Sequence, residues 1–179
     1  MVEIIEGSGL ENGEEASQFL TFMLSGEEFA VPIMKVKEII EYSDLTNVPM
    51  VPEFIAGAIN LRGSVVPVVN LAIKFGMSPG EITRRTCVVI MEVEMDDEQI
   101  VMGVLVDKVL QVIDIADENI DSAPSLGAQI RTDFIRGMAK LDDRFVIILA
   151  INRVLSSGEI TVLGNINNET EAATDVTAG

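Results

Sequence analysis

The stretch FIAGAINLRGSVVPVVNL, residues 54–71, decides the fold class of this chain. Two apolar runs flank a turn that contains Arg62 and Gly63, which is the pattern of a β-hairpin. Pro67 has no N–H group, so the second strand is expected to lie at a sheet edge or to break its ladder there. The stretch holds no Cys, His, Asp or Glu that could serve as a metal ligand or acid/base pair. A shaped, mostly apolar surface with one fixed cation suits protein recognition better than catalysis.

The framework of this hairpin occurs a second time. An offset of 80 residues aligns FIAGAINL, residues 54–61, with FIRGMAKL, residues 134–141, and preserves Phe, Ile, Gly and Leu. An offset of 73 aligns residues 30–36 with residues 103–109. Two copies of one β unit are the natural interpretation, with chance matching of apolar positions as the alternative. Short strands in this number close best as small barrels, because closure hides their edges.

The charge is strongly negative and concentrated at the two ends. The net charge is −17; residues 1–17 hold five acids and no base, and residues 156–179 hold four acids and no base. Both ends are therefore expected to be solvated acidic tails. A chain of this charge is repelled by nucleic acid and by anionic lipid. No apolar run approaches a membrane span and no signal peptide is visible, which predicts a cytoplasmic protein without membrane insertion.

The residue inventory argues against an enzyme and against a metal site. The chain has no His, which removes the commonest general base and rules out Cys/His zinc sites. Its single cysteine, Cys87, lies in an apolar run and is expected to be an inert thiol. The acidic residues within 91–99 could be proposed as a divalent cation site, but a solvated hairpin tip is the better interpretation. An enzyme that uses carboxylates alone remains the rival class, although no acid pair lies in apolar surroundings.

Three motifs together resemble the CheW family of bacterial chemotaxis adaptors. The most specific is F-I-x-G-x-x-N-L-R-G-x-x-x-P-V-x-x-L over residues 54–71. Supporting motifs are V-x-E-I at residues 36–39 and G-x-x-V-D-x-V-x-x-V at residues 103–112. The resemblance implies a mainly β fold, made of two pseudo-repeated five-stranded SH3-like β-barrels with a few short helices. It covers residues 18–155.

The resemblance also divides the chain. The charge distribution predicts that residues 1–17 form an acidic, disordered N-terminal tail, and the resemblance implies that residues 18–155 form the CheW-like domain. The second barrel subdomain is expected to start near residue 86. Residues 156–179 form an acidic C-terminal tail outside the resemblance.

The family implies a non-enzymatic scaffold without metal or other cofactor. Such a protein couples the cytoplasmic tip of methyl-accepting chemoreceptors to the regulatory domain of the histidine kinase CheA, which has the same fold. It resides in the cytoplasm, associated with membrane-bound receptor arrays. A CheW-like adaptor of a non-chemotaxis array, such as one that controls pili, a paralogue with its own receptors, and a piece of a larger protein with a receiver domain stay open.

Eight positions match the family's receptor-binding surface, and the kinase-facing surface is expected only as a region around the first barrel. The apolar members are more often core residues than contacts when judged on sequence alone. We also hypothesise that Glu38 and Arg62 pair and so hold the receptor-facing loop in shape. The expected receptor-binding residues are Val36, Glu38, Ile39, Gly57, Arg62, Thr86, Val109 and Val112.

Overall fold

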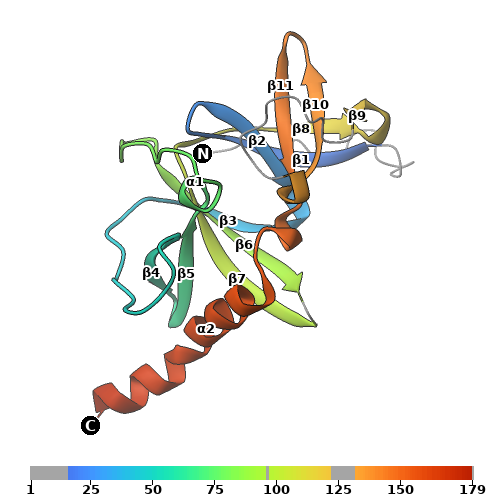
Figure 1. The fold of residues 1–179 in the computed structure, drawn as a ribbon. Coiled ribbons are helices and arrows are strands. Elements are labelled where there is room, and N and C mark those ends of the chain that lie inside the picture. Colours follow the sequence, from blue (N-terminus) through green and yellow to red (C-terminus); the bar gives the residue numbers. More distant parts are fainter. Residues whose placement is uncertain (1–15, 96, 122–131, 179) are drawn as a thin grey trace.

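Two sheets build the molecule. The computed structural model describes residues 16–95, 97–121 and 132–178. Sheet A contains, in spatial order, β8 (Lys108–Ala116), β1 (Ala16–Leu24), β2 (Glu27–Pro32), β11 (Arg144–Leu149), β10 (Ile135–Leu141) and β9 (Ile120–Asp121). Sheet B contains β3 (Val36–Glu41), β6 (Cys87–Met95), β7 (Glu98–Val106), β5 (Ser64–Asn70) and β4 (Ile55–Leu61). The expected mainly β architecture of two small SH3-like barrels is confirmed, and Figure 1 shows the two sheets one above the other.

Helical segments are short except for the last one. The α-helices are α1 (Leu71–Lys74) and α2 (Ser157–Ala178). The 3-10 turns are η1 (Ile33–Lys35), η2 (Asp117–Asn119), η3 (Thr132–Phe134) and η4 (Ile151–Arg153).

Each barrel combines strands from both sequence copies. The β1–β2 hairpin of the first copy pairs with β8 and, through β2, in parallel with β11. The β6–β7 hairpin of the second copy pairs with β3 and, through β7, in parallel with β5. The expected boundary near residue 86 therefore separates the two copies but not the two barrels, because the copies exchange their first hairpins.

The hydrophobic core joins the barrels as well as filling them. The largest cluster contains Leu20 and Phe29 of sheet A together with Val89 and Val104 of sheet B. Each sheet also has a smaller cluster of its own. Because the shared cluster buries side chains from both sheets, apolar burial stabilises the barrels together rather than one at a time.

Pro67 lies inside a sheet rather than at an edge. Strand β5 has β7 on one side and β4 on the other, so the edge alternative for this strand was wrong. The parallel pairing with β7 begins at Val68, opposite Gly103. Pro67 therefore lies just before the segment of β5 that pairs with β7. Its missing N–H removes no hydrogen bond from the β5–β7 ladder.

The acidic C-terminal segment forms a helix, which corrects its interpretation as a solvated tail. Residues Ile160, Leu163 and Ile166 of α2 are at most 5% exposed and belong to the shared core. Their spacing of three residues places them on one helix face, and burial of that face holds the helix against the barrel. Figure 1 shows α2 crossing sheet B at β7 and β5, with its C-terminal end projecting beyond them. The expected N-terminal tail falls mostly outside the described residues, and β1 already begins at Ala16.

A side chain of α2 completes the backbone hydrogen bonding of sheet B. The Nδ2 atom of Asn167 donates to the carbonyl oxygens of Val65 and Val101, both at 3.0 Å. Its Oδ1 accepts from the Val101 N–H at 3.2 Å. Val65 and Val101 lie before the paired segment of β5 and β7, so Asn167 supplies partners where the ladder is absent.

Glu159 ties the start of α2 to both barrels. Its two carboxylate oxygens each lie 2.7 Å from the Lys74 Nζ, which lies 4.9 Å from the Phe54 ring centroid and 5.7 Å from that of Phe134. Phe54 and Phe134 are equivalent in the repeat, so one cation contacts both barrels. The Ser156 N–H donates to Glu159 at 2.8 Å and the Ser156 Oγ accepts from the Glu159 N–H at 3.2 Å, which is a capping box. Burial opposes ionisation of Glu159, but hydrogen bonds from Lys74 and Ser156 outweigh it and lower its pKa.

We predict that Glu159→Ala lowers the free energy of unfolding by about 2 kcal/mol, because it removes a helix cap and leaves Lys74 without its carboxylate. The exposed Glu118→Ala is the matched control and should change it by less than about 0.5 kcal/mol. Chemical denaturation measures both. Because the pKa of Glu159 lies below its ordinary 4.5 in the folded state, its contribution is full above that pH and is lost as the pH falls through the folded-state pKa. Equal losses in the two variants at pH 7 would contradict this role.

Candidate functional site

A groove with a volume of about 920 Å³ runs between β3 and β8. These strands end the spatial order of sheet B and of sheet A, so the groove follows the meeting line of the two barrels. They are also the same strand of the repeat, taken once from each copy, because an offset of 73 relates Val36 to Val109. The residues that line the groove are Ile33, Val36, Lys37, Glu38, Ile39, Ile40, Glu41, Arg84, Arg85, Cys87, Lys108, Val109 and Leu110.

The apolar part of the groove is half-buried. Val36, Ile39 and Val109 are partly exposed, and each packs against the shared core from its outer side. Their positions on these two strands form a partly exposed apolar strip along the groove. Such a strip between rigid walls is the kind of surface that accepts an amphipathic helix.

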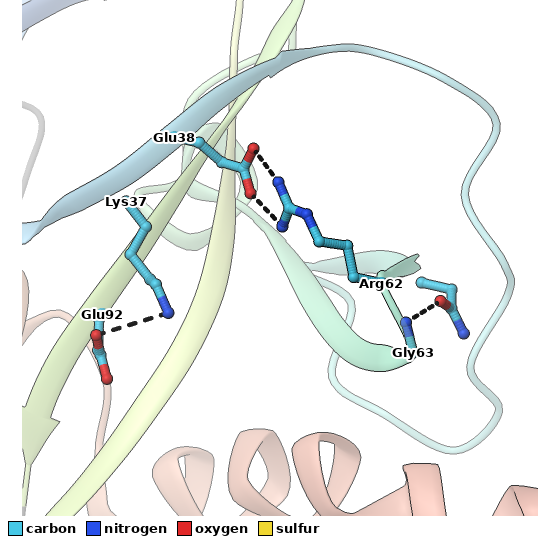
Figure 2. Close-up of polar contacts among 6 residues, drawn as sticks. Lys37, Glu38, Arg62, Gly63 and Glu92 are labelled. Atoms are coloured by element: carbon cyan, nitrogen blue, oxygen red, sulfur yellow. Dashed lines mark hydrogen bonds and ion pairs between the residues drawn. The ribbon is translucent and has the colours of Figure 1, made fainter.

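Glu38 and Arg62 form a bidentate ion pair at one side of the groove, which confirms the predicted pairing (Figure 2). The Arg62 Nη1 lies 2.9 Å from Oε2 of Glu38 and its Nη2 lies 3.0 Å from Oε1. The hydrogen bond from Arg62, assisted by its charge, lowers the pKa of Glu38, and Glu38 in turn raises the pKa of Arg62. The Arg62 side chain is 75% exposed and that of Glu38 31%, so the pair fixes geometry on the surface more than it stabilises the fold.

The hairpin turn between β4 and β5 aims Arg62 toward β3. Arg62 and Gly63 have φ values of 52° and 89°, so both central residues are left-handed, as a two-residue hairpin loop of type I′ requires. The Oδ1 of Asn60 accepts a hydrogen bond from the Gly63 N–H at 3.0 Å and braces the turn. Figure 2 shows the Arg62 side chain reaching back from this turn to Glu38, while Lys37 on the same strand points toward Glu92.

Two of the predicted contact residues are buried instead. Val112 is 8% exposed and faces the core, and Thr86 is 3% exposed. The Oγ1 of Thr86 accepts from the Thr83 N–H at 2.8 Å, and its carbonyl oxygen accepts from the Tyr42 N–H at 3.1 Å. Any influence of these two on a partner would therefore pass through the residues they support.

Gly57 is fixed by a close backbone approach. It lies at a register shift between β4 and β5, where an added Cβ would be 2.7 Å from the Thr46 carbonyl oxygen. Its repeat equivalent, Gly137, lies at the same kind of shift, and a Cβ there would be 2.6 Å from the Asp121 carbonyl oxygen. Since both copies need a glycine at this position, the role of Gly57 is structural. It lets strand β4 pass close to the backbone at Thr46.

Sequence reasoning missed the cations of the groove. Arg84, Arg85 and Lys108 line it, and none was singled out in advance. Arg84 and Arg85 are the only adjacent pair of basic residues in this acidic sequence, and that doublet was the available signal. Cys87 also lines the groove; burial, then the negative charge of Glu41, raises its pKa, which keeps it in the unreactive thiol form.

Within residues 16–95, 97–121 and 132–178 no group of three or more Cys, Asp or Glu residues could hold a metal ion. Asp96, one of the acidic residues within 91–99, lies outside that part. Among the helices that the structure describes, none combines the length and the apolar character needed to cross a membrane. The fold and the groove thus define a class of β protein with two small barrels and an open groove between β3 and β8.

Comparison with known proteins shows which family the chain matches. Residues 18–159 match the model of the CheW-like domain. The chemotaxis protein CheW of Klebsiella aerogenes is 34% identical over 155 residues, which cover 86% of this chain and 91% of that protein. The chemotaxis protein CheW of Bacillus subtilis is 35% identical over 147 residues, which cover 82% of this chain and 89% of that protein.

A solved structure agrees with the sequence matches. The crystal structure of the scaffolding protein TtCheW from Thermoanaerobacter tengcongensis superposes with a TM-score of 0.74 at 29% identity and covers 88% of this chain and 99% of that one. The chain therefore belongs to the CheW-like domain family. It is a chemotaxis scaffold rather than an enzyme, as the motifs led us to expect.

We predict that Gly57→Ala destabilises the fold by about 2–4 kcal/mol, because the new Cβ must displace backbone at Thr46. Gly158→Ala is the matched control. No atom lies within 4 Å of a Cβ built there, and alanine favours the helix, so stability should be unchanged or rise by about 0.5–1 kcal/mol. Thermal unfolding of both variants tests this structural role of Gly57. A Gly57→Ala protein as stable as wild type would contradict it.

Proposed function

We propose that this chain couples the cytoplasmic tips of methyl-accepting chemoreceptors to the regulatory domain of the histidine kinase CheA. The observation that carries the proposal is the groove between β3 and β8, with the Glu38–Arg62 pair held at its side. The receptor tip is expected to be a helical hairpin, and an apolar strip between two strand walls fits one helix of it. The site would lie in the cytoplasm, next to the membrane-bound array.

The receptor contact would rest on the residues that the structure gathers at this groove. Val36, Ile39 and Val109 would supply its apolar strip, and Glu38, held in place by Arg62, would shape its border. Apolar contacts at the centre of such an interface supply most of the affinity, and charged residues at its border set orientation.

The kinase contact would use a different surface, around the barrel of sheet B. The CheA regulatory domain is expected to share this two-barrel fold, so the two proteins can pack barrel against barrel. Receptor and kinase could then bind at once, and receptor signals would shift the populations of kinase states rather than make or break bonds.

We predict that reversal of either charge, Glu38→Arg or Arg62→Glu, weakens co-sedimentation with receptor cytoplasmic fragments by about tenfold or more. Each change places two like charges next to each other and removes the hydrogen bonds that hold the β4–β5 turn to β3. The double exchange, Glu38→Arg with Arg62→Glu, should restore part of the binding because the pair can form again in the opposite sense.

The matched control is Asp142→Lys. Asp142 occupies the turn position equivalent to Arg62 in the second copy, has a φ of 55° and a side chain that is 90% exposed. This change is also a charge reversal, yet binding should stay at the wild-type level. Full receptor binding by both single groove variants would exclude a functional pair, and failure of the wild-type protein to bind either receptor fragments or CheA would refute the coupling role.

A further inference from the structure

The lining of the groove is positive, although the chain as a whole carries a charge of −17. Four cations line the groove against two acids, Glu38 and Glu41. The carboxylate of Glu38 is already engaged by Arg62 at 2.9 and 3.0 Å. The partner would therefore meet a cationic border in a molecule that elsewhere repels anions. The four cations are Lys37, Arg84, Arg85 and Lys108.

Three of these cations are available to a partner. Arg84 and Arg85 are exposed and Lys108 is half-buried. Among the described residues none of the three makes an ion pair, whereas Lys74 and Arg144 are engaged by Glu159 and Glu28. Lys37 is held only loosely, with its Nζ 3.8 Å from Glu92. Among the described residues, Arg84, Arg85 and Lys108 thus take no part in the ion pairs that join the elements of the fold.

We propose that the element bound in this groove is an amphipathic helix whose apolar stripe is flanked by carboxylates. The inference rests on the proposed function and adds the chemistry of the partner. Val36, Ile39 and Val109 would take the apolar stripe, while Arg84, Arg85 and Lys108 would take the acids beside it. The long Arg stems can also cover apolar surface with their charged ends in water.

Charge complementarity of this kind acts mainly on specificity and on the association rate. An acidic helix would be repelled by most of this molecule and attracted by the groove, so the field itself would select the binding face. Exposed charges are screened within about 10 Å at 0.1 M salt, so the association rate should fall as salt rises.

The test uses the full chain and a receptor cytoplasmic fragment as the probe, followed by surface plasmon resonance between about 0.05 M and about 0.5 M salt. The variant Arg84→Glu with Arg85→Glu should slow association by about tenfold or more at low salt and flatten the salt dependence. The milder Arg84→Gln with Arg85→Gln should lie between it and wild type. Neutralising the acids of the fragment's tip, Glu→Gln and Asp→Asn, should remove the difference between the variants.

The matched control is Lys140→Glu with Arg153→Glu, which changes the net charge equally at two exposed residues outside the groove lining. It should slow association far less than the groove variant. Two results would overturn the acidic-helix inference. One is an equal decrease of the association rate in the groove variant and the control variant, and the other is a wild-type association rate that does not change with salt concentration.

The outcome also separates this inference from the function on which it depends. If Glu38→Arg abolishes binding while the Arg84 and Arg85 variants bind normally, the receptor uses the groove and is not acidic there. If the wild-type chain binds no receptor fragment at all, the proposed function fails first. Binding to phosphatidylglycerol vesicles that the Arg84→Glu/Arg85→Glu variant loses would assign the cations to a lipid surface and overturn the inference.

Discussion

Two short parallel pairings, β2 with β11 and β5 with β7, link strands from the two copies of the repeat. Each copy gives its first hairpin to the barrel of the other, so neither barrel can be completed by one half of the chain. The shared hydrophobic cluster then packs the two barrels against each other. This exchange leaves the equivalent strands β3 and β8 at the ends of the two sheets, and the groove lies where they face each other. The groove, and with it the proposed binding surface, is thus a consequence of how the two copies exchange their hairpins.

The departures from this internal symmetry are as informative as the symmetry. Arg62 stands at the turn where the second copy has Asp142, and Lys74 has no basic counterpart at Val154. Helix α2 packs on sheet B, where Asn167 bridges β5 and β7. The corresponding strands of sheet A are joined at their ends by the ion pair of Glu28 and Arg144, with a 2.7 Å contact. A duplicated unit thereby presents two different barrels, as the proposed coupling of two unlike partners would require.

The strands could be predicted because they follow from local pattern. The two SH3-like barrels were implied by the resemblance to the CheW family, and the Glu38–Arg62 pair was a hypothesis about two opposite charges. Gly57 and Gly137 mark the same close approach in both copies, and the repeated motif reports that constraint directly. The exchange of hairpins between the copies could not be predicted in this way. The sequence of a hairpin is the same whether it pairs with its own copy or with the other one. Helix α2 was missed because its acidic composition was weighed without its periodicity. The Ser156-x-x-Glu159 box and the apolar spacing from Ile160 to Ile166 would have revealed it.

The exposed ion pair of Glu38 and Arg62 contributes little to the stability of the fold, but it affects the charge of the groove. Without Arg62, the carboxylate of Glu38 would add a negative charge to the lining of the groove, which also includes Glu41. With Arg62 bound to both of its oxygens, Glu38 contributes little field, and the cations Arg84, Arg85 and Lys108 dominate the border. Because the Arg62 hydrogen bond lowers the pKa of Glu38, the pair stays ionised throughout the neutral range. The hairpin corner therefore shapes the charge of the groove as well as its outline. Under the proposed function, one exposed arginine would thus affect a partner bound along the whole groove.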